Sequence, residues 1–455
     1  MISIRNLIIL MCMVLLSASL FAGGFALTGV GSRATAMGGA FRAVSDDASA
    51  MFWNPAGLGF MNENSVHLGG TFILPSATWD PTGTTLTGIP GYAAKEYESE
   101  KSLRMFPTAF ATKTKESRLK YGLGIYVPYG LGTTWDAYQL PTSQFTYESG
   151  FPENEMMSSV GVVDLHPSFA YRILPNLSAG AGLSVMFGAI DIAKIGFSAV
   201  LDSTFSVPFP DIAPISTELG GAGIGFGANM GLMYKPTESL SIGLSGKLPS
   251  TISMTGEAEV YFWKPLLSAE SPAMKVGGKS DIEADLKLPA EIGLGLAYNV
   301  MPNWTVSVDY AYTMWSRLDK VTVEMDDPIF LIPGAYSISK SELTFDWEDT
   351  SRISLGTEYL LKCTKLRAGF FYDQTPIPES TQLPTLSDIS DKMSFNFGFG
   401  RPFGPLELDM NAQYVMFSER EVTTAAYDAG NSPTNTLGVY NSNSISGNIG
   451  LTYRF

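Results

Sequence analysis

Histidine and cysteine are scarce in this chain of 455 residues, which holds two of each. Metal sites and disulfide frameworks are built from clusters of these residues, so we predict no bound metal, no cofactor and no disulfide framework. Basic residues are also in the minority, with 29 Lys and Arg against 44 Asp and Glu and a formal net charge of −15. This balance excludes nucleic acid as an expected partner, because phosphate binding requires clustered Lys and Arg.

Long apolar runs are absent beyond the first residues of the chain, which disfavours a bundle of transmembrane helices. Arg5 is followed by an apolar stretch from Leu7 to Leu16 and then by small residues up to Ala22. This order is typical of a secretory signal peptide, so we expect residues 1–22 to be removed on export. The exported chain would keep one cysteine, Cys363, which we interpret as a small apolar residue.

Glycine, by contrast, is abundant, with 46 residues, and many segments alternate apolar residues with small or polar ones. Between Gly221 and Leu232 the even positions hold the larger, mostly apolar side chains, and the odd positions hold glycine or asparagine. Near the end of the chain, Ile449, Leu451 and Tyr453 alternate with small or polar residues. A period of two places each set on one face of a β-sheet, so the pattern predicts an all-β protein.

Strand length separates a soluble β-sandwich from a membrane barrel, because both would show this alternation. Strands of soluble proteins average about 5–6 residues, whereas a membrane-spanning strand needs about 9–11. The alternating segments are of the longer kind, and an even number of them fits a single-chain bacterial barrel. We predict fourteen strands, at 65–75, 103–115, 118–130, 157–173, 176–190, 219–236, 238–250, 281–300, 303–320, 342–362, 364–376, 391–402, 404–420 and 441–455.

The connections between these strands alternate between short and long. The short turns are Lys115–Arg118, Leu174–Asn176, Lys235–Glu238, Val300–Asn303, Leu361–Thr364 and Arg401–Pro405. The long segments are 76–102, 131–156, 191–218, 251–280, 321–341, 377–390 and 421–440. Periplasmic turns and extracellular loops produce this alternation in outer-membrane barrels. We therefore predict a 14-stranded antiparallel transmembrane β-barrel in the outer membrane of a Gram-negative bacterium, spanning residues 65–455. Its last strand, ending in Phe455, is expected to contact the barrel-assembly machinery, and its outer face is expected to contact membrane lipid.

Residues 23–64 precede the first predicted strand and are rich in Gly and Ala. Ser45 is placed to cap a short helix that runs through Trp53, with Asp46 and Asp47 in its first turn. Pro55 should end this helix, because the residue before a proline is driven out of the helical conformation. We interpret the segment as a hatch, a compact plug with short helices inside the barrel. The alternative is an extension into the periplasm.

Several motifs in a fixed order carry a resemblance to a known family. They are Gly24-Phe25-Ala26-Leu27, Ser45-Asp46-Asp47-Ala48, Asn54-Pro55-Ala56-Gly57, Val127-Pro128-Tyr129-Gly130-Leu131, Lys287-Leu288-Pro289, Asp309-Tyr310-Ala311-Tyr312-Thr313-Met314-Trp315-Ser316, Trp347-Glu348-Asp349-Thr350-Ser351-Arg352 and Arg367-Ala368-Gly369-Phe370-Phe371-Tyr372-Asp373-Gln374-Thr375-Pro376. Together they resemble the FadL-type family of long-chain fatty acid and hydrocarbon transporters. The resemblance covers essentially the whole chain after the signal peptide.

The resemblance implies a barrel plugged by an N-terminal hatch, in which Asn54, Pro55, Ala56 and Gly57 belong to the gating part. It also implies that hydrophobic ligand enters from an extracellular groove and leaves sideways at an inward kink of the third strand. By position this kink would lie at 126–132, where the residues that weaken pairing are Pro128, Gly130 and Gly132. The alternative is that Pro128 only marks the extracellular end of that strand.

The long segments contain apolar side chains that water-facing loops would not need. A groove for an acyl chain and packing of one loop on another would use the same residues. The candidates for the groove are Phe145, Phe151, Phe197, Phe205 and Phe209. The basic residues that hold the ligand in the family have no clear counterpart, since Ala189 and Asp191 occupy the region where one is expected. This departure puts recognition of a carboxylate headgroup in doubt and favours an uncharged ligand.

Three classes of function remain to be compared. Passive uptake of hydrophobic compounds, with long-chain fatty acids first and uncharged aromatic or aliphatic hydrocarbons as the alternative, accounts for the hatch and the resemblance. A porin for small polar solutes would call for an open lumen. An outer-membrane hydrolase could use Asp164, His166 and Ser168, but residues two apart on a strand lie about 7 Å apart, so we predict no enzyme. Asp326 and Asp327 are interpreted as solvated charges rather than as a calcium site.

Overall fold

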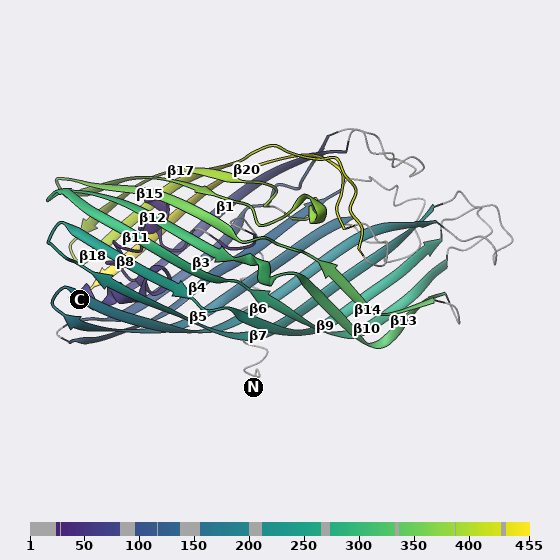
Figure 1. Ribbon diagram of the computed structural model, residues 1–455, viewed down its shortest axis with the longest axis horizontal. Helices are drawn as coiled ribbons and strands as arrows, with labels where there is room; N and C mark the ends of the chain where they lie inside the picture. Colours follow the sequence, from purple (N-terminus) through teal and green to yellow (C-terminus); the bar gives the residue numbers. More distant parts are fainter. Residues whose placement is uncertain are drawn as a thin grey trace.

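The computed structural model describes residues 24–27, 29–81, 96–115, 117–136, 155–199, 212–264, 274–332, 336–386, 388–428 and 434–455. These residues form one antiparallel sheet that closes on itself as a 14-stranded barrel (Figure 1). The first and last strands close the ring, with pairs that run from Ser65 opposite Arg454 to Asp80 opposite Val439. Within the described residues no helix is long and apolar enough to cross a membrane. The predicted fold class is confirmed.

Ten strands of the wall are continuous. They are β1 (Ser65–Asp80), β3 (Arg104–Lys113), β4 (Leu119–Trp135), β5 (Met156–Leu174), β6 (Leu177–Ala199), β7 (Ile212–Tyr234), β16 (Thr364–Asp373), β17 (Lys392–Phe403), β18 (Leu406–Phe417) and β20 (Gly438–Arg454). Four more are each interrupted once. They are β8 (Leu240–Lys247) with β9 (Ser250–Lys264), β10 (Met274–Leu288) with β11 (Ala290–Met301), β12 (Trp304–Met314) with β13 (Lys320–Ile332), and β14 (Tyr336–Thr344) with β15 (Thr350–Leu361).

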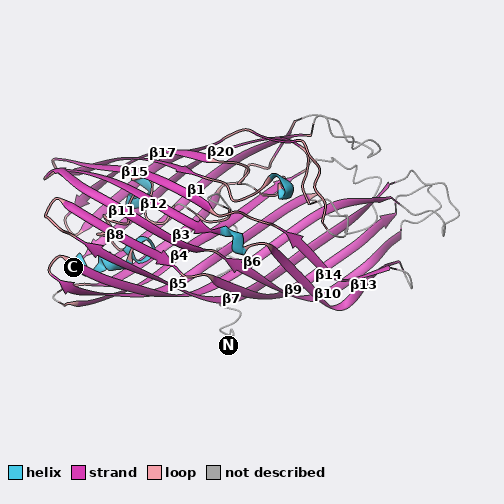
Figure 2. Ribbon diagram, viewed as in Figure 1, coloured by secondary structure: helices cyan, strands magenta, loops and turns pink. Residues whose placement is uncertain are grey.

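The remaining elements are short. They are β2 (Tyr97–Glu98), β19 (Arg420–Val422), the 3-10 helices η1 (Pro55–Phe60), η2 (Trp315–Arg317) and η3 (Glu379–Thr381), and the α-helices α2 (Ser32–Ala36) and α3 (Ala50–Trp53). Figure 2 shows α2, α3 and η1 among the strands near the end of the barrel that carries the C-terminus. The terminal Phe455 is exposed, and its recognition by the assembly machinery stays a prediction.

Three segments expected to be long loops are mostly strand, so these predictions were wrong. β6 and β7 extend through most of 191–218, β9 and β10 through most of 251–280, and β13 and β14 through most of 321–341. The reason lies in the two faces of these strands. Along β10, Asp281, Glu283 and Asp285 are exposed while Ile282 and Leu286 are buried, which is the reverse of a lipid-facing strand. We call β9, β10, β13 and β14 the extension.

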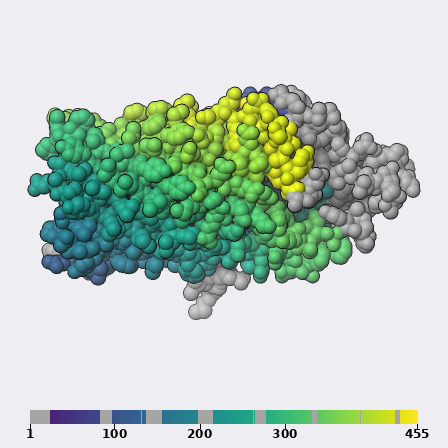
Figure 3. Space-filling model, in the orientation of Figure 1, coloured from purple at the N-terminus to yellow at the C-terminus, as the bar shows by residue number. Residues whose placement is uncertain are grey.

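The part of the wall that contains β8, β11, β12 and β15 has the opposite pattern, and we call it the belt. In β11 the exposed residues are Ile292, Leu294 and Leu296, and the inward positions between them are glycine. Apolar residues outside and small or polar residues inside are the pattern of a transmembrane strand. In Figure 1 the extension lies toward the end of the barrel opposite the C-terminus, and Figure 3 shows the outer surface of one face of the barrel. The extension therefore stands beyond the membrane, on the side opposite the short turns.

The segment before β1 is buried and touches strands around the ring. α2 contacts β16, β17, β18 and β20, while η1 contacts β4, β5, β6 and β7. The predicted end of the helix before Pro55 is confirmed, because α3 ends at Trp53. The predicted cap was wrong: α3 begins at Ala50, and the Ser45 hydroxyl donates to the Phe41 carbonyl at 2.7 Å. Asp46 and Asp47 do not lie in the first turn of α3.

Candidate functional site: an apolar lumen beside a gap in the wall

The inward face of the extension is apolar and encloses a cavity. Strands β6, β7, β9, β10, β13 and β14 supply its lining, and none of the described lining residues is charged. The larger lining residues are Ile190, Ile192, Leu219, Met254, Ile282, Leu286, Val321, Val323 and Leu343. An inward face of this kind favours apolar molecules over water, because each Å² of apolar surface removed from water contributes about 25 cal/mol.

The hydrogen-bonded ladder between β3 and β4 ends early. The two strands pair from Lys113 opposite Tyr121 only as far as Ala109 opposite Ile125. Beyond this point residues 105–108 of β3 continue to pair with β1, and the ladder between β3 and β4 does not include them. The ladder between β4 and β5 is irregular at the same height, where the pairing shifts between Tyr126 and Tyr129. The third strand of the wall therefore bends away from its neighbour and leaves a gap.

The N-terminal residues occupy the edge of β4 that β3 has left. The Leu27 amide donates to the Pro128 carbonyl at 2.8 Å, and the Gly130 amide donates to the Phe25 carbonyl at 2.7 Å. Gly132 lies two residues further along β4, which continues to Trp135. The alternative that Pro128 marks the end of the strand is therefore wrong. The structure brings the three predicted kink residues to the gap, while their role as an exit stays a prediction.

Apolar side chains line the inner side of this gap. Leu27, Ile73, Phe106 and Val127 form one buried cluster, each no more than 6 % exposed. Phe106 lies on the part of β3 that is not paired with β4, and Val127 lies in the irregular part of β4. A hydrophobic molecule that moved from the lumen toward the lipid would meet only apolar side chains in this cluster.

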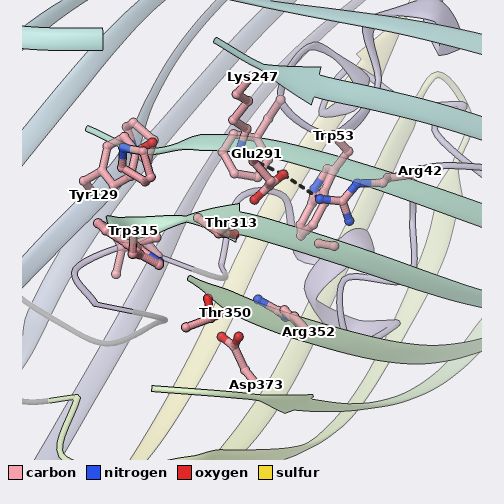
Figure 4. Close-up of a pocket in the computed structure, with 16 residues that line it drawn as sticks. Arg42, Trp53, Tyr129, Lys247, Glu291, Thr313, Trp315, Thr350, Arg352 and Asp373 are labelled. Carbon is pink, nitrogen blue, oxygen red and sulfur yellow. Dashed lines mark hydrogen bonds and ion pairs between the residues drawn. The ribbon is translucent and has the colours of Figure 1, made fainter. Parts of the chain in front are cut away.

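A charged cavity lies beside the kink (Figure 4). Pro128 and Tyr129 line it from β4, and the charged residues that line it are Arg42, Lys247, Glu291, Arg352 and Asp373. The Arg42 guanidinium donates to Glu291 at 2.6 Å, which the dashed line in Figure 4 marks. Lys247 lies 3.8 Å from the same carboxylate, so Glu291 faces two of the three cations. The Arg352 guanidinium instead donates to the Ser354 hydroxyl and the Gly38 carbonyl, both at 3.3 Å.

Asn54 joins the N-terminal segment to the wall. Its side-chain amide donates to the carbonyls of Arg42 at 2.9 Å and Leu232 at 3.1 Å, and its oxygen accepts from the Ala56 amide at 3.1 Å. Pro55 then begins η1, where a missing amide proton costs nothing. A side chain at Gly57 would lie 1.9 Å from the Ser45 carbonyl, so only glycine fits. The motif is a tight packing junction, and its gating role stays a prediction.

Ion pairs hold α2 to the opposite side of the wall. Arg33 donates to both carboxylate oxygens of Glu358, at 2.8 and 2.9 Å. Glu358 also accepts from Arg367 at 2.6 Å, and Arg367 reaches Asp409 at 2.5 Å. All four side chains are mostly buried, so removing one of them would leave its partner charged and unpaired.

The first described residue, Gly24, is held by a buried acid outside the strands. Its amide donates to Asp388 at 2.6 Å, and Lys392 donates to the other carboxylate oxygen at 2.7 Å. Burial raises the pKa of Asp388 to about 6, and the ion pair with Lys392 opposes that shift. The hold on the N-terminal residues is therefore strongest where Asp388 is ionised, above pH about 6.

The predicted groove and the predicted hydrolase residues have different outcomes. Four of the groove residues, Phe145, Phe151, Phe205 and Phe209, lie outside the described residues, and only the backbone of Phe197 is described, in β6. Asp164 and His166 contact each other at 3.3 Å, so the distance argument against that pair was wrong. Ser168 is not joined to them, because its hydroxyl is buried without a partner.

The sequence interpretation missed the inward residues of the extension. The signal was present as Lys279, Asp281, Glu283, Asp285 and Lys287, which alternate with mostly apolar residues in β10. The sequence analysis expected apolar residues to face lipid, so it overlooked this alternation in β10. The apolar residues of β10 face the lumen instead.

Comparison with known proteins places the chain in a family. The model of the outer membrane protein transport protein family (OMPP1/FadL/TodX) matches residues 13–455. Outer membrane protein P1 of Haemophilus influenzae is 25 % identical over 449 residues, covering 91 % of this chain and 90 % of that protein. The long-chain fatty acid transport protein of Escherichia coli O6:H1 is 24 % identical over 448 residues, covering 90 % and 92 %.

Solved structures show the same fold. A Pseudomonas aeruginosa FadL homologue superimposes with a TM-score of 0.75 at 18 % identity, covering 94 % of this chain and 99 % of that one. The Ralstonia pickettii toluene transporter TbuX gives a TM-score of 0.67 at 18 % identity, with the same coverage. The chain therefore belongs to the OMPP1/FadL/TodX family of outer membrane protein transport proteins, as a β-barrel of the Gram-negative outer membrane.

Proposed function

We propose that this protein is a passive channel for the uptake of hydrophobic compounds. Substrate enters the apolar lumen of the extension and leaves sideways into the membrane through the gap between β3 and β4. The single observation that carries the proposal is the early end of the ladder at Ala109 and Ile125, next to apolar residues on both sides. An intact barrel wall has no such break in the ladder between neighbouring strands.

A sideways exit is energetically preferable to release into the periplasm. An acyl chain bound in the apolar lumen is already removed from water, and transfer to lipid keeps about 25 cal/mol for each Å² of its surface. Release into water would lose that free energy. The N-terminal segment blocks the straight path in this proposal, since it contacts strands around the ring. A porin for polar solutes would lack both features.

Long-chain fatty acids are the proposed substrates, and two relatives that match most of the chain are named as long-chain fatty acid transport proteins. The second candidate is an uncharged hydrocarbon. One observation favours it: none of the described residues that line the apolar cavity is charged. Toluene transporters share the fold.

Uptake into an uptake-deficient strain and into proteoliposomes tests the proposal. We expect entry of a long-chain fatty acid or of toluene and little swelling in sugar solutions. Comparison of the two compounds decides between the substrate classes. Swelling in sugars without uptake of either compound would contradict the channel.

Variants at the kink test the exit. Gly130→Trp and Gly132→Trp should abolish uptake while the folded barrel and ligand binding persist, because the new side chains fill the space beside the gap. Gly196→Trp is the matched control, since Gly196 lies in β6 and a β-carbon added there would meet no described atom within 4 Å beyond its chain neighbours. Normal transport by both kink variants would place the exit elsewhere.

A further inference from the structure

Three cations converge at the end of the barrel that carries the short turns and, in Figure 2, the helix η1. They are Lys120 of β4, Arg172 of β5 and Lys235, the residue after β7. Each is next to a tyrosine that is exposed on the outer face, so its own side chain points into the lumen. We call these three residues the cation cluster.

The cation cluster surrounds the end of η1, whose last residue is Phe60. The guanidinium carbon of Arg172 lies 4.8 Å from the centroid of the Phe60 ring, and the Lys235 ammonium lies 4.5 Å from the same centroid. The Lys120 ammonium donates to the carbonyl of the next residue, Met61, and the Lys120 side chain is buried, at 2 % exposure. The three cations therefore meet where the N-terminal segment leaves η1.

No acid of the described residues forms an ion pair with the cation cluster. Both oxygens to which Lys120 donates are neutral, and the second belongs to the Asn62 side chain at 3.3 Å. Arg172 Nε is buried and has no hydrogen-bond partner among the residues that the structure describes. The acid that acts on Lys235 is Asp46, but this carboxylate forms an ion pair with a residue of α2.

Another side of the same barrel end shows inward cations that do have a partner. Lys365 of β16 lies 2.5 Å from one carboxylate oxygen of Glu407, and Arg454 of β20 lies 2.5 Å from the other. Because the chain carries a formal net charge of −15, acids are plentiful, and a cluster of cations that lacks one is an exception. Like charges repel each other at short range, so an anion bound among them would be stabilised.

We propose that Lys120, Arg172 and Lys235 form a binding site for a phosphate group at the periplasmic end of the lumen. The planar guanidinium of Arg172 matches phosphate oxygens, with Nε free to donate, and the two lysines act as point charges. A phosphate monoester carries a charge of about −1.5 to −2 at pH 7 and three acceptor oxygens, so such a group can meet all three cations. A carboxylate offers two oxygens and a single charge.

Free phosphate and the headgroup of a phospholipid in the periplasmic leaflet offer the same chemical group. The site shares no residue with the apolar cavity or with the cluster beside the gap, so the inference goes beyond the proposed function and does not depend on it. A phosphate bound there would lie against the end of the N-terminal segment, since the cation cluster contacts Phe60 and Met61.

Calorimetric titration of the full-length barrel with inorganic phosphate, in a non-ionic detergent, tests the site. We expect saturable binding, and Arg172→Gln and Lys235→Met should each weaken it about tenfold, because a hydrogen bond between charged groups is lost. Both side chains are only half-buried, so these variants should fold, and the buried Lys120→Met is a third test. Lys362→Met, at an exposed lysine in a short turn of the same barrel end, is the matched control and should bind phosphate normally.

Titration with acetate tests the selectivity of the site. Acetate should bind more weakly than phosphate, because its single charge meets fewer of the cations. Absence of phosphate binding, binding that the three cluster variants leave unchanged, or equal binding of acetate would overturn the proposal.

Lipid discs distinguish the two sources of phosphate. If free phosphate is the ligand, discs of phosphatidylcholine and discs that contain phosphatidylglycerol should give the same affinity for inorganic phosphate. If a phospholipid headgroup is the ligand, phosphatidylglycerol should weaken the binding of inorganic phosphate to the natural protein. Either result supports the site, provided that Arg172→Gln weakens phosphate binding in the phosphatidylcholine discs, and binding that this variant leaves unchanged there would overturn the proposal.

Discussion

β12 and β13 follow each other in the chain, yet their two faces carry opposite chemistry. In β12, Val308 and Tyr310 are exposed outside while Ser307 and Asp309 are buried inside. In β13 the exposed residues before Pro328 are all charged, and the inward positions are Val321, Val323 and Met325, while Phe330 is exposed near the end of the strand. The short helix η2 separates the two strands. The belt has the pattern of a wall in lipid, and the extension has the pattern of a wall in water around an apolar lumen.

This contrast explains how one barrel can offer a hydrophobic route without a hydrophobic pore. Inside the belt, the inward polar residues are used by the N-terminal segment, which they bind through ion pairs and hydrogen bonds. Inside the extension the same positions are free to bind an apolar molecule. The gap between β3 and β4 lies between these two environments, next to the kink.

Deleting residues 24–61 should have the largest effect, because it removes the partner of the polar lumen. The wall pairs through its own ladders, so we expect the barrel to assemble and to conduct ions strongly while losing selective uptake. Conductance in planar bilayers measures this, with heat-modifiable migration as the control for folding. Equal conductance before and after the deletion would show that the segment is not a plug.

A charged side chain on the inward face of the extension should make that part of the lumen unfavourable for an apolar substrate. Val323→Glu buries a carboxylate, which costs several kcal/mol, in the face proposed to bind substrate. Uptake of fatty acid should fall about tenfold or more. Thr322→Glu, one residue away on the outward face of β13, is the matched control and should transport normally. Equal uptake by the two variants would show that the substrate does not pass through the apolar lumen.

A smaller effect is expected where the N-terminal segment ends. Phe60 lies under two cations, with Arg172 at 4.8 Å and Lys235 at 4.5 Å from the ring centroid. Phe60→Ala should raise the basal conductance a few-fold, since each such contact is worth about 0.5–1 kcal/mol at an exposed site. Phe403→Ala, at an exposed phenylalanine near a short turn, serves as the control. An unchanged basal conductance would show that Phe60 does not help to hold the N-terminal segment in the barrel.

The barrel could be predicted from the sequence because each β-strand is indicated by a pattern among neighbouring residues. The alternation from Gly221 to Leu232 and the weak pairing at Pro128 are both properties of neighbouring residues. The contacts within the lumen, by contrast, join residues that are far apart in the sequence. The approach of Asp164 to His166 depends on β6 and β7, and Arg33 donates to Glu358, which lies 325 residues away in the sequence. Ser45 failed as a cap because its hydroxyl turns back to Phe41 within the same segment.

Reversible closure of the gap between β3 and β4 tests the central claim most directly. In a Cys363→Ser background, Phe106→Cys and Val127→Cys place thiols on the two sides of the gap and permit bridging by a cleavable bifunctional reagent. A second pair, Ala111→Cys and Leu123→Cys, bridges the same two strands where they are already paired. The account predicts that bridging the gap stops uptake of hydrophobic compounds, that cleaving the bridge restores it, and that the second pair has no effect. Normal uptake with the gap bridged would contradict the sideways exit.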